Sequence, residues 1–346
     1  MDTKKNEAYL EATQDQSEIK IRRNQMKAIV NTRYGSPDVL QLQEIERPTP
    51  KNNEVLIKIH AVAVNAADWH VLRADPFLVR LQFGLFKPKH TILGADISGR
   101  IEAVGRDVRR FKVGDDVFGD ISGSGWGGFA EYVCAREETL ALKPANISFE
   151  EAAAVPMAAV TALQGLRKGG IEPGQKVAIN GASGGVGTFA LQIAKALGAE
   201  VTAVCSTRNI DLARSLGADH VIDYAQEDFT KNGMQYDLIL ATNGYHPLAD
   251  YQQALSTTGR YVMTGGANAQ MTEAMLYGPL KSRNGKQQMG NLLAQPNQKD
   301  LEYVAELLTA GKVKPVIAKR YPLAETADAI RDMEAGRAQG KIIITV

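Results

Sequence analysis

The run Asn180-Gly181-Ala182-Ser183-Gly184-Gly185-Val186-Gly187 lies between an apolar stretch at 176–180 and an Ala-rich apolar stretch at 186–197. A glycine-rich turn between a strand and a helix is the context that phosphate binding requires. Glycines let the backbone approach a pyrophosphate, and the helix N-terminus offers free N–H groups and a favourable dipole. Such a turn can also serve packing alone. Because a complete β-α-β frame surrounds it, we predict dinucleotide binding through residues Ala182, Ser183, Gly184, Gly185, Val186 and Gly187.

Strand-like and helix-like segments alternate on both sides of this turn. Strands are expected at 176–180, 200–205, 220–224, 236–242 and 260–265, and helices at 149–168, 186–197 and 210–216. Alternation of this kind implies right-handed crossovers and a parallel sheet covered on both faces. We therefore predict a doubly wound, Rossmann-type domain over residues 148–289, with its ligand cleft beyond the carboxyl ends of the strands.

The rest of the chain has a different pattern. Short β-type runs separated by Gly, Pro and Asp turns occur at 26–31, 55–64, 99–104 and 132–135. Near the end, a helix is expected at 301–310, a β-like segment at 313–316 and a closing strand at 342–346 that returns to the first domain. The predicted fold is α/β, with a mostly-β domain built from 26–147 and 290–346 beside the Rossmann domain.

Composition narrows the classes of partner. Lys and Arg number 40 against 39 Asp and Glu in 346 residues, so no large field of one sign is available for nucleic acid or an acidic membrane surface. Residues 1–25 are polar and lack the apolar core of a signal peptide, so we expect a flexible leader and a cytoplasmic protein. Cys134 and Cys205 each stand alone in an apolar run, which predicts core residues and excludes a site with several thiolates.

The end of the second strand bears on the choice of cofactor. An NAD site usually places an acidic side chain there, and this chain has Cys205-Ser206-Thr207-Arg208 instead. Hydroxyls and a guanidinium suit a 2′-phosphate through charge-assisted hydrogen bonds, which favours NADPH. Arg208 could equally be a solvated charge in a turn, and the sequence leaves both readings open.

Several stretches together resemble a known family. They are Gly35-Ser36-Pro37-Asp38-Val39-Leu40, Val64-Asn65-Ala66-Ala67-Asp68-Trp69, 155–162, the glycine-rich turn, 216–224 and Gly336-Arg337-Ala338-Gln339-Gly340-Lys341. In this order, they make residues 26–346 resemble a zinc-independent quinone oxidoreductase of the medium-chain dehydrogenase/reductase superfamily.

The resemblance implies a GroES-like catalytic domain for the mostly-β part, and a homodimer formed through sheet edges or Rossmann faces. It also implies residues that contact NADPH. Thr161 would lie near the nicotinamide, Gly265 and Gly266 would border its end of the site, and Lys341 would approach from the terminal strand. Tyr224 and the turn from Ser206 to Arg208 would flank the adenosine phosphate.

The chain departs from the zinc alcohol dehydrogenases of this superfamily. Those enzymes have a Cys where Asn65 stands and Gly-His-Glu where this chain has Gly94-Ala95-Asp96. Four closely spaced cysteines for a structural zinc are also missing, so we expect no metal. Without a Lewis acid the acceptor must itself be electrophilic. A quinone or an α,β-unsaturated carbonyl meets that requirement.

Two residues are candidates for catalysis. Asn65 is hypothesised to donate a hydrogen bond to the acceptor carbonyl, or it is a turn residue that bonds its own backbone. Asp68 either orients a water molecule or caps a helix. By resemblance, Trp69 and the loop 73–90 shape the pocket, and the apolar part of that loop, 77–86, is either a lid or core. The proton that completes enone reduction is expected from solvent.

Other functions stay open on the sequence. One is the reduction of activated ketones or enoyl thioesters, for which Arg80, Lys87 and Lys89 could bind a coenzyme A phosphate. Another is a non-catalytic NADPH-binding protein, since a fold does not fix a function. NADPH oxidation that depends on an acceptor separates the binding protein from the enzymes.

Overall fold

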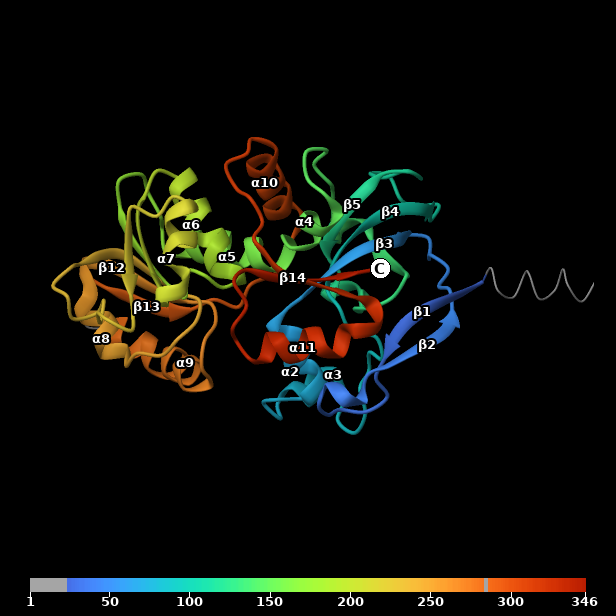
Figure 1. Cartoon of the computed structure of the whole chain (residues 1–346), viewed down its shortest axis with the longest axis horizontal. Coiled ribbons are helices and arrows are strands. Elements are labelled where there is room, and N and C mark those ends of the chain that lie inside the picture. The colour runs from blue at the N-terminus through green and yellow to red at the C-terminus, as the bar shows by residue number, and fades with distance from the viewer. Residues whose placement is uncertain (1–23, 283–285) are drawn as a thin grey trace, which may run out of the picture.

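The apolar runs beside the glycine-rich turn form one parallel sheet, in the yellow and orange lobe of Figure 1. The structure, a computed structural model, describes residues 24–282 and 286–346. Strand order in this sheet is β10-β9-β8-β11-β12-β13, which runs outward from β8 in both directions and confirms the doubly wound arrangement. The strands are β8 (Lys176–Asn180), β9 (Glu200–Cys205), β10 (His220–Asp223), β11 (Tyr236–Ala241), β12 (Leu255–Met263) and β13 (Gln288–Asn291).

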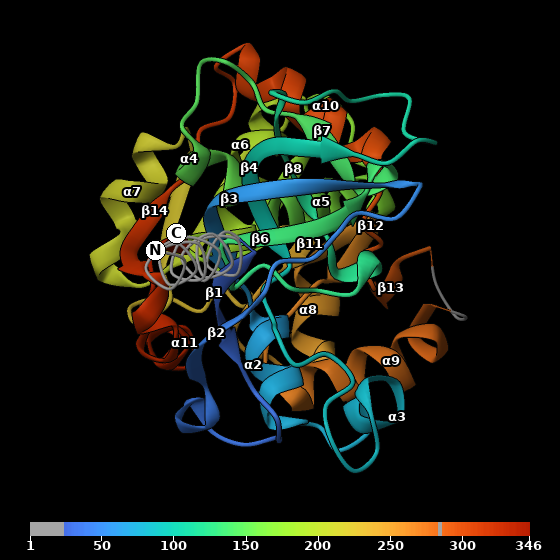
Figure 2. The same ribbon diagram turned by 90° about the vertical axis from the view of Figure 1, so that its right-hand side faces the viewer.

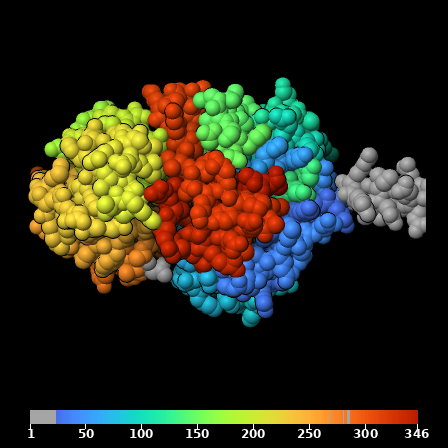
Figure 3. Space-filling model, in the orientation of Figure 1, coloured from blue at the N-terminus to red at the C-terminus, as the bar shows by residue number. Residues whose placement is uncertain are grey.

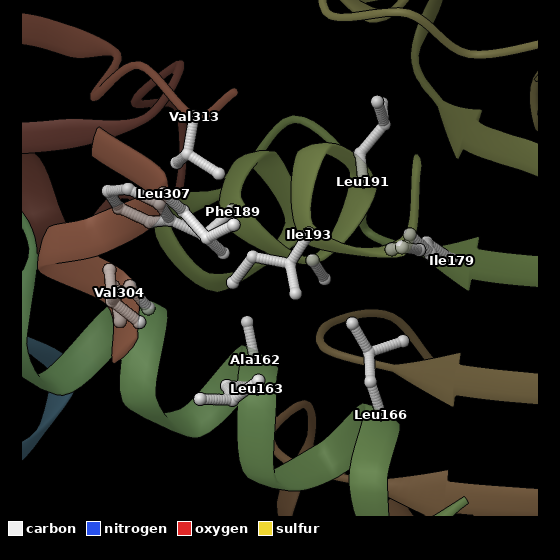
Figure 4. Packing of buried hydrophobic residues seen from close by; sticks show 14 of the residues in the cluster. Ala162, Leu163, Leu166, Ile179, Phe189, Leu191, Ile193, Val304, Leu307 and Val313 are labelled. Carbon is white, nitrogen blue, oxygen red and sulfur yellow. The ribbon is translucent and has the colours of Figure 1, made fainter. Parts of the chain in front are cut away.

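One helix before these strands and four helices between them contribute to the apolar core of the lobe. They are α5 (Pro156–Lys168), α6 (Gly185–Ala196), α7 (Ile210–Ser215), α8 (Leu248–Ala254) and α9 (Asn268–Ser282). Phe189 and Ile193 of α6 pack in one buried cluster with Leu163 of α5 (Figure 4). Val304 and Leu307 of α10 (Gln298–Thr309) belong to the same cluster. Helix α10, which the sequence places with the mostly-β domain, therefore packs against α5 of the Rossmann lobe and also contacts the strand Leu140–Leu142 of the other lobe.

The second lobe is a GroES-like sheet of antiparallel strands around β3. Figure 2 shows β3 crossing this lobe between β4 and β6, both of which pair with it. The strands of this sheet that precede the Rossmann lobe are β3 (Glu54–Val64), β4 (Asp96–Val104), β5 (Asp116–Asp120), β6 (Tyr132–Arg136) and β7 (Leu140–Leu142). β1 (Gln25–Val30) and β2 (Gln41–Glu46) pair with each other in a separate two-stranded sheet. The helices are α2 (Ala66–Arg73), α3 (Val79–Phe83) and α4 (Phe149–Ala153).

The C-terminal segment returns to this lobe, as predicted. β15 (Lys341–Thr345) pairs antiparallel with β3 and parallel with β14 (Ile317–Pro322). In Figure 3 this red segment, with α11 (Thr326–Glu334), lies between the yellow and blue parts of the molecule. The first residue of β15, Lys341, is thereby brought to the boundary between the lobes.

The expected single helix at 149–168 is wrong. The structure has two helices, α4 and α5, separated at Ala154 and Val155, with Pro156 as the first residue of α5. Proline has no N–H and its ring clashes with the preceding turn, so it is well tolerated at a helix start and costly in the middle of one. The break gives α5 its own N-terminus, and the N–H of Met157 there donates to Asp96 Oδ1 at 3.0 Å.

The β-like segment at 313–316 is also wrong, because the strand begins only at Ile317. Pro315 cannot donate to a sheet. Lys314 instead exchanges two hydrogen bonds with the side-chain amide of Gln192 on α6, at 2.8 and 2.9 Å. These bonds tie the returning segment to the Rossmann lobe.

Other boundaries shift by a few residues. β13 extends to Asn291, which pairs with Met263 in the Rossmann sheet, so that lobe continues past the expected limit at 289. Of the predicted leader, residues 1–23 lie outside the described residues, and Gln25 already starts β1. Cys205 is buried as predicted, whereas Cys134 is only partly buried. Within the described parts of the chain, no helix is long and apolar enough to cross a membrane.

Candidate active site between the lobes

A cavity of about 660 Å³ lies between the two lobes, within the usual range for small-molecule sites of roughly 300–1,000 Å³. It gathers residues that the sequence places far apart. Eight of the predicted site residues line it: Asn65, Thr161, Gly184, Gly185, Val186, Gly265, Gly266 and Lys341. Trp69 lines it too, but no residue of the loop 73–90 does. In that loop Phe77, Leu78, Leu81 and Phe86 are each more than 60% exposed, which excludes the core interpretation for these four.

The glycine-rich turn forms one end of the cavity. Gly184 is the N-cap of α6 and has no side chain to occupy the first-turn N–H groups, which remain available to a ligand. Gly187 allows the turn to close, because a Cβ atom there would lie 2.1 Å from the carbonyl oxygen of Gly181. Ala182 is buried beneath the turn, and Ser183 accepts a hydrogen bond from Gly340 N at 2.9 Å through its carbonyl. These residues fit a pyrophosphate cradle.

The residues that follow β9 and β10 do not line the cavity, but they lie next to the glycine-rich turn. The N–H of Tyr224 donates to the Cys205 carbonyl at 3.1 Å, which brings Tyr224 beside the turn that contains Ser206. Arg208 is exposed and donates to the carbonyl of Arg337 at 3.1 Å. These side chains are therefore placed where an extended dinucleotide could reach them.

Asn209 connects the glycine-rich turn to the residues after β9, and it was not among the residues predicted from the sequence. Its Nδ2 donates to Ser183 Oγ at 2.7 Å and to Ser206 Oγ at 3.0 Å, and its Oδ1 accepts from Gln339. A lone asparagine after a strand carries no signal that would have marked it in advance.

Asn65 lines the cavity from the other lobe, directly before α2. Its Nδ2 donates to Asp96 Oδ2 at 3.0 Å and to the Ala63 carbonyl at 3.3 Å, while its Oδ1 accepts from the Lys341 ammonium. Both N–H groups of the amide are thus engaged within the protein. In this geometry Asn65 has no free amide hydrogen for the hypothesised bond to an acceptor carbonyl, and its Oδ1 holds the Lys341 ammonium.

Two carboxylates lie behind Asn65 and are fully buried. Asp68 accepts from Asn65 N at 2.7 Å and from Gly94 N at 3.0 Å, so it caps the start of α2. Asp96 accepts from Met157 N and from Asn65, and its Oδ2 lies 3.6 Å from Lys341 Nζ. Burial raises the pKa of each carboxyl to about 7, and the hydrogen bonds and Lys341 oppose that rise only in part. Burial likewise lowers the pKa of Lys341.

A third buried acid, Asp120 at the end of β5, lines the cavity itself. Its Oδ1 accepts from Ser122 N at 2.9 Å, and burial raises the pKa of its carboxyl. The sequence analysis did not single it out. An acidic residue that ends the run Val117-Phe118-Gly119 was the available signal, since a charge seldom ends a buried strand without a partner.

Metal-type ligands come together at one place among the described residues, Asp228, His246 and Asp250. None of these lines the cavity. The ammonium of Lys231 lies 3.1 Å from Asp228 and 3.2 Å from Asp250, so a side-chain cation already occupies the space between these carboxylates. Ala95, which stands where the zinc enzymes have a histidine, is fully buried and does not line the cavity, and the next residue, Asp96, lies 3.6 Å from the Lys341 ammonium.

A GroES-like domain joined to a Rossmann domain, with a cavity between them that reaches a glycine-rich helix N-terminus, defines a medium-chain dehydrogenase/reductase. Residues 51–145 match the alcohol dehydrogenase GroES-like domain, and residues 216–344 match a family described as zinc-binding dehydrogenase. Among curated proteins, the chain is 36% identical to the chloroplast envelope quinone oxidoreductase homolog of Arabidopsis thaliana, over 92% of this chain and 98% of that protein.

Two further comparisons agree. The chain is 35% identical to 2-methylene-furan-3-one reductase of Solanum lycopersicum, over 93% of this chain and 79% of that protein. Among solved structures, the quinone oxidoreductase from Coxiella burnetii superposes with a TM-score of 0.82 at 31% identity, over 93% of this chain and 99% of that one. The chain belongs to the zinc-independent quinone oxidoreductase-like family of this superfamily, whose members are nicotinamide-dependent oxidoreductases.

Proposed function

We propose that this protein is an NADPH-dependent reductase of quinones or α,β-unsaturated carbonyls. The observation that carries the proposal is a single cavity lined both by the phosphate-type turn of Gly184 and Gly185 and by the Asn65–Lys341 pair, with the Lys341 side chain next to Gly185. The names of two relatives point the same way: a quinone oxidoreductase homolog, and a reductase of 2-methylene-furan-3-one, in which a carbon–carbon double bond is conjugated to a ketone.

The residues present fit a bound NADPH. Free N–H groups at the start of α6 suit the pyrophosphate, and Thr161, Gly265 and Gly266 line the cavity on the same side. When bound, the cofactor supplies a hydride to the acceptor. The protein's part is to hold the acceptor, exclude water and stabilise the charge that arrives with the hydride.

Preference for NADPH over NADH rests on the end of the second strand. Ser206 and the exposed guanidinium of Arg208 would bind a 2′-phosphate. The nearest acidic side chain, Asp223, already accepts hydrogen bonds from Thr207 Oγ1 at 2.6 Å and Ala225 N at 3.0 Å. A carboxylate engaged in this way is less available to the ribose hydroxyls of NADH.

Lys341 is the residue best placed to stabilise developing negative charge. Its ammonium lies at the cavity wall, 4% exposed, and is held by Asn65 and Asp96. A positive charge in a dry site interacts with an enolate or quinol oxygen far more strongly than it would in water. This role comes in addition to the cofactor contact that the family resemblance implies for Lys341.

The structure offers no observation that favours thioester reduction. The guanidinium of Arg80 lies over the ring of Tyr34, 4.9 Å from its centroid, and none of Arg80, Lys87 and Lys89 lines the cavity.

The test is NADPH oxidation by EDTA-treated protein with a panel of quinones, enones, simple ketones and enoyl thioesters, repeated with NADH. Turnover of quinones or enones with NADPH preferred is the expected result. Silence with every acceptor despite tight NADPH binding would instead indicate the non-catalytic binding protein. Loss of activity on EDTA treatment would contradict the metal-free mechanism.

We also infer that the protein forms a homodimer. Its cytoplasmic location stays a prediction from the sequence. β13 pairs only with β12 among the described strands, which leaves an edge of the Rossmann sheet for a second copy. Light scattering coupled to size-exclusion chromatography distinguishes a dimer of the 37.5 kDa chain from a monomer.

A further inference from the structure

The buried acids at the cavity differ in how their oxygens are satisfied. Both oxygens of Asp68 and both oxygens of Asp96 accept hydrogen bonds from the protein. Asp120 is different. Its Oδ1 is held by Ser122 N, but its Oδ2 is buried and accepts from no described group. Of the three, Asp120 alone lines the cavity.

With three carboxyl groups and one cation, the charge of this cluster favours two carboxyl groups that keep their protons. Asp68, Asp96 and Asp120 face a single buried cation, Lys341, so full ionisation would leave two uncompensated negative charges out of water. Such charges are costly, and buried acids avoid that cost by remaining protonated. Asp68 and Asp96 already accept hydrogen bonds at every oxygen. A proton on Asp120 Oδ2 instead converts a buried, unsatisfied acceptor into a donor, on a residue that lines the cavity.

We propose that Asp120 is the catalytic acid that protonates the α-carbon of an enone acceptor after hydride has reached its β-carbon. This inference rests on the proposed function and names the source of the proton, which the sequence analysis had assigned to solvent.

Hydride from NADPH, which is oxidised to NADP+, adds to the β-carbon, the carbon–carbon π pair moves toward the carbonyl, and an enolate forms. The O–H bond of Asp120 breaks and a C–H bond forms at the α-carbon. The saturated ketone leaves, and the Asp120 carboxylate regains a proton from water before the next turnover.

Other titratable groups at the cavity are less suited to this step. His70 lines the cavity, but its Nδ1 lies 2.6 Å from the carbonyl oxygen of Asp75 and its ring stacks on Trp69. Lys341 is needed as a cation between Asn65 and Asp96, and deprotonation would leave the buried carboxylates unpaired.

The experiment follows the stereochemistry of proton delivery. Wild type and Asp120→Asn reduce 2-methylcyclohex-2-enone, or another α-methyl enone that wild type accepts, with unlabelled NADPH in D₂O. Deuterium then marks the α-carbon. Wild type is expected to give one α-configuration. Asp120→Asn, which cannot supply a proton, is expected to turn over about 100-fold more slowly and to give a mixture at that carbon, while NADPH binding stays unchanged.

Asp116→Asn is the matched control. It makes the same chemical change on the same strand, at a side chain that pairs with Arg100 outside the cavity. It should keep both the wild-type rate and the single α-configuration.

Asp120→Asn that keeps a single α-configuration would overturn the proposal, whatever its rate. If this variant does not fold, as judged by circular dichroism and NADPH fluorescence, Asp120→Ser is held to the same criteria. A wild-type enzyme that reduces enones but delivers deuterium to both faces would also overturn it, and would leave the proposed function intact. A wild type that reduces no enone or quinone would refute the proposed function itself.

Discussion

Lys341 Nζ, on the last strand, lies 3.6 Å from Asp96 Oδ2, on β4, and both side chains are almost completely removed from solvent. Asn65 connects the two, because it donates to Asp96 and accepts from Lys341. The residues are far apart in sequence and meet at the cavity only because β15 pairs with β3. The ion pair therefore forms only when β15 has paired with β3, and the same pairing brings the Lys341 ammonium to the candidate site.

Lys341→Met should destabilise the protein strongly, because it leaves a buried carboxylate without its cation. Breaking one partner of a buried pair typically costs about 3 to 5 kcal/mol. Urea unfolding at pH 8, where Asp96 would otherwise be ionised, measures the change. The double variant Lys341→Met, Asp96→Asn should recover a large part of the loss, since no charge is then left unpaired. A double variant no more stable than the single one would contradict this account of the pair.

The buried acids also predict how stability depends on pH. Burial raises the pKa of Asp96 from 3.8 to about 7, so between these values the folded state holds a proton that the unfolded chain has released. The contribution of Asp96 to stability is therefore present at low pH and is lost as pH rises toward 7.

Comparison of wild type with Asp96→Asn isolates that contribution, because the amide does not titrate. Urea unfolding at pH 5, 6 and 7 should show the stability of wild type falling relative to the variant as pH increases. Carboxyl groups held by cations, such as Asp116 beside Arg100, have lowered pKa values, so they finish losing their protons below the pH range of this experiment. A stability difference that is flat, or that grows with pH, would show that Asp96 is ionised throughout.

Much of the Rossmann lobe was predictable because its signals are local. A strand such as β8 is a short apolar run ended by glycine, and its bounds match the expected 176–180. The errors arose where a single proline decides the outcome. Pro156 starts a helix instead of sitting within one, and Pro315 keeps its segment out of the sheet. Both consequences follow from the missing N–H, so the sequence contained the signal.

The candidate site was less predictable, since its contacts are between distant segments. Asn65, Thr161 and Lys341 were found through family resemblance, and the structure places all of them around the cavity. Their partners were not found. Nothing local shows that Asp120 would have one unsatisfied oxygen, because that depends on which elements pack against β5.

Arg208→Gln should lower kcat/KM for NADPH about 10-fold and leave kcat/KM for NADH nearly unchanged. The reason is the loss of a charge-assisted hydrogen bond to the 2′-phosphate, which is worth about 1.5 to 3 kcal/mol before exposure to solvent weakens it. Arg214→Gln on the next helix is the control, because that arginine is also exposed and pairs only locally with Asp211. If Arg208→Gln lowers activity with both cofactors equally, the residue does not read the 2′-phosphate.

Substitution by alanine should affect stability differently at two glycines of the glycine-rich turn, because an added Cβ atom would have different neighbours at each. A Cβ atom at Gly187 would lie 2.1 Å from the Gly181 carbonyl oxygen, so the backbone must move, and we expect Gly187→Ala to lose about 1 to 3 kcal/mol of stability. At Gly184 the nearest atom would be 3.5 Å away, an ordinary contact, and the fold should lose only about 0.5 kcal/mol.

Gly184 lines the cavity, however, so its added methyl group would project toward the proposed pyrophosphate position. We therefore expect Gly184→Ala to raise the Kd for NADPH at least 10-fold while its urea midpoint stays close to that of wild type. Fluorescence titration and urea unfolding of both variants separate the two effects. Unchanged NADPH affinity in a folded Gly184→Ala protein would mean that the dinucleotide does not approach this turn, since no backbone contact that close tolerates an extra carbon atom.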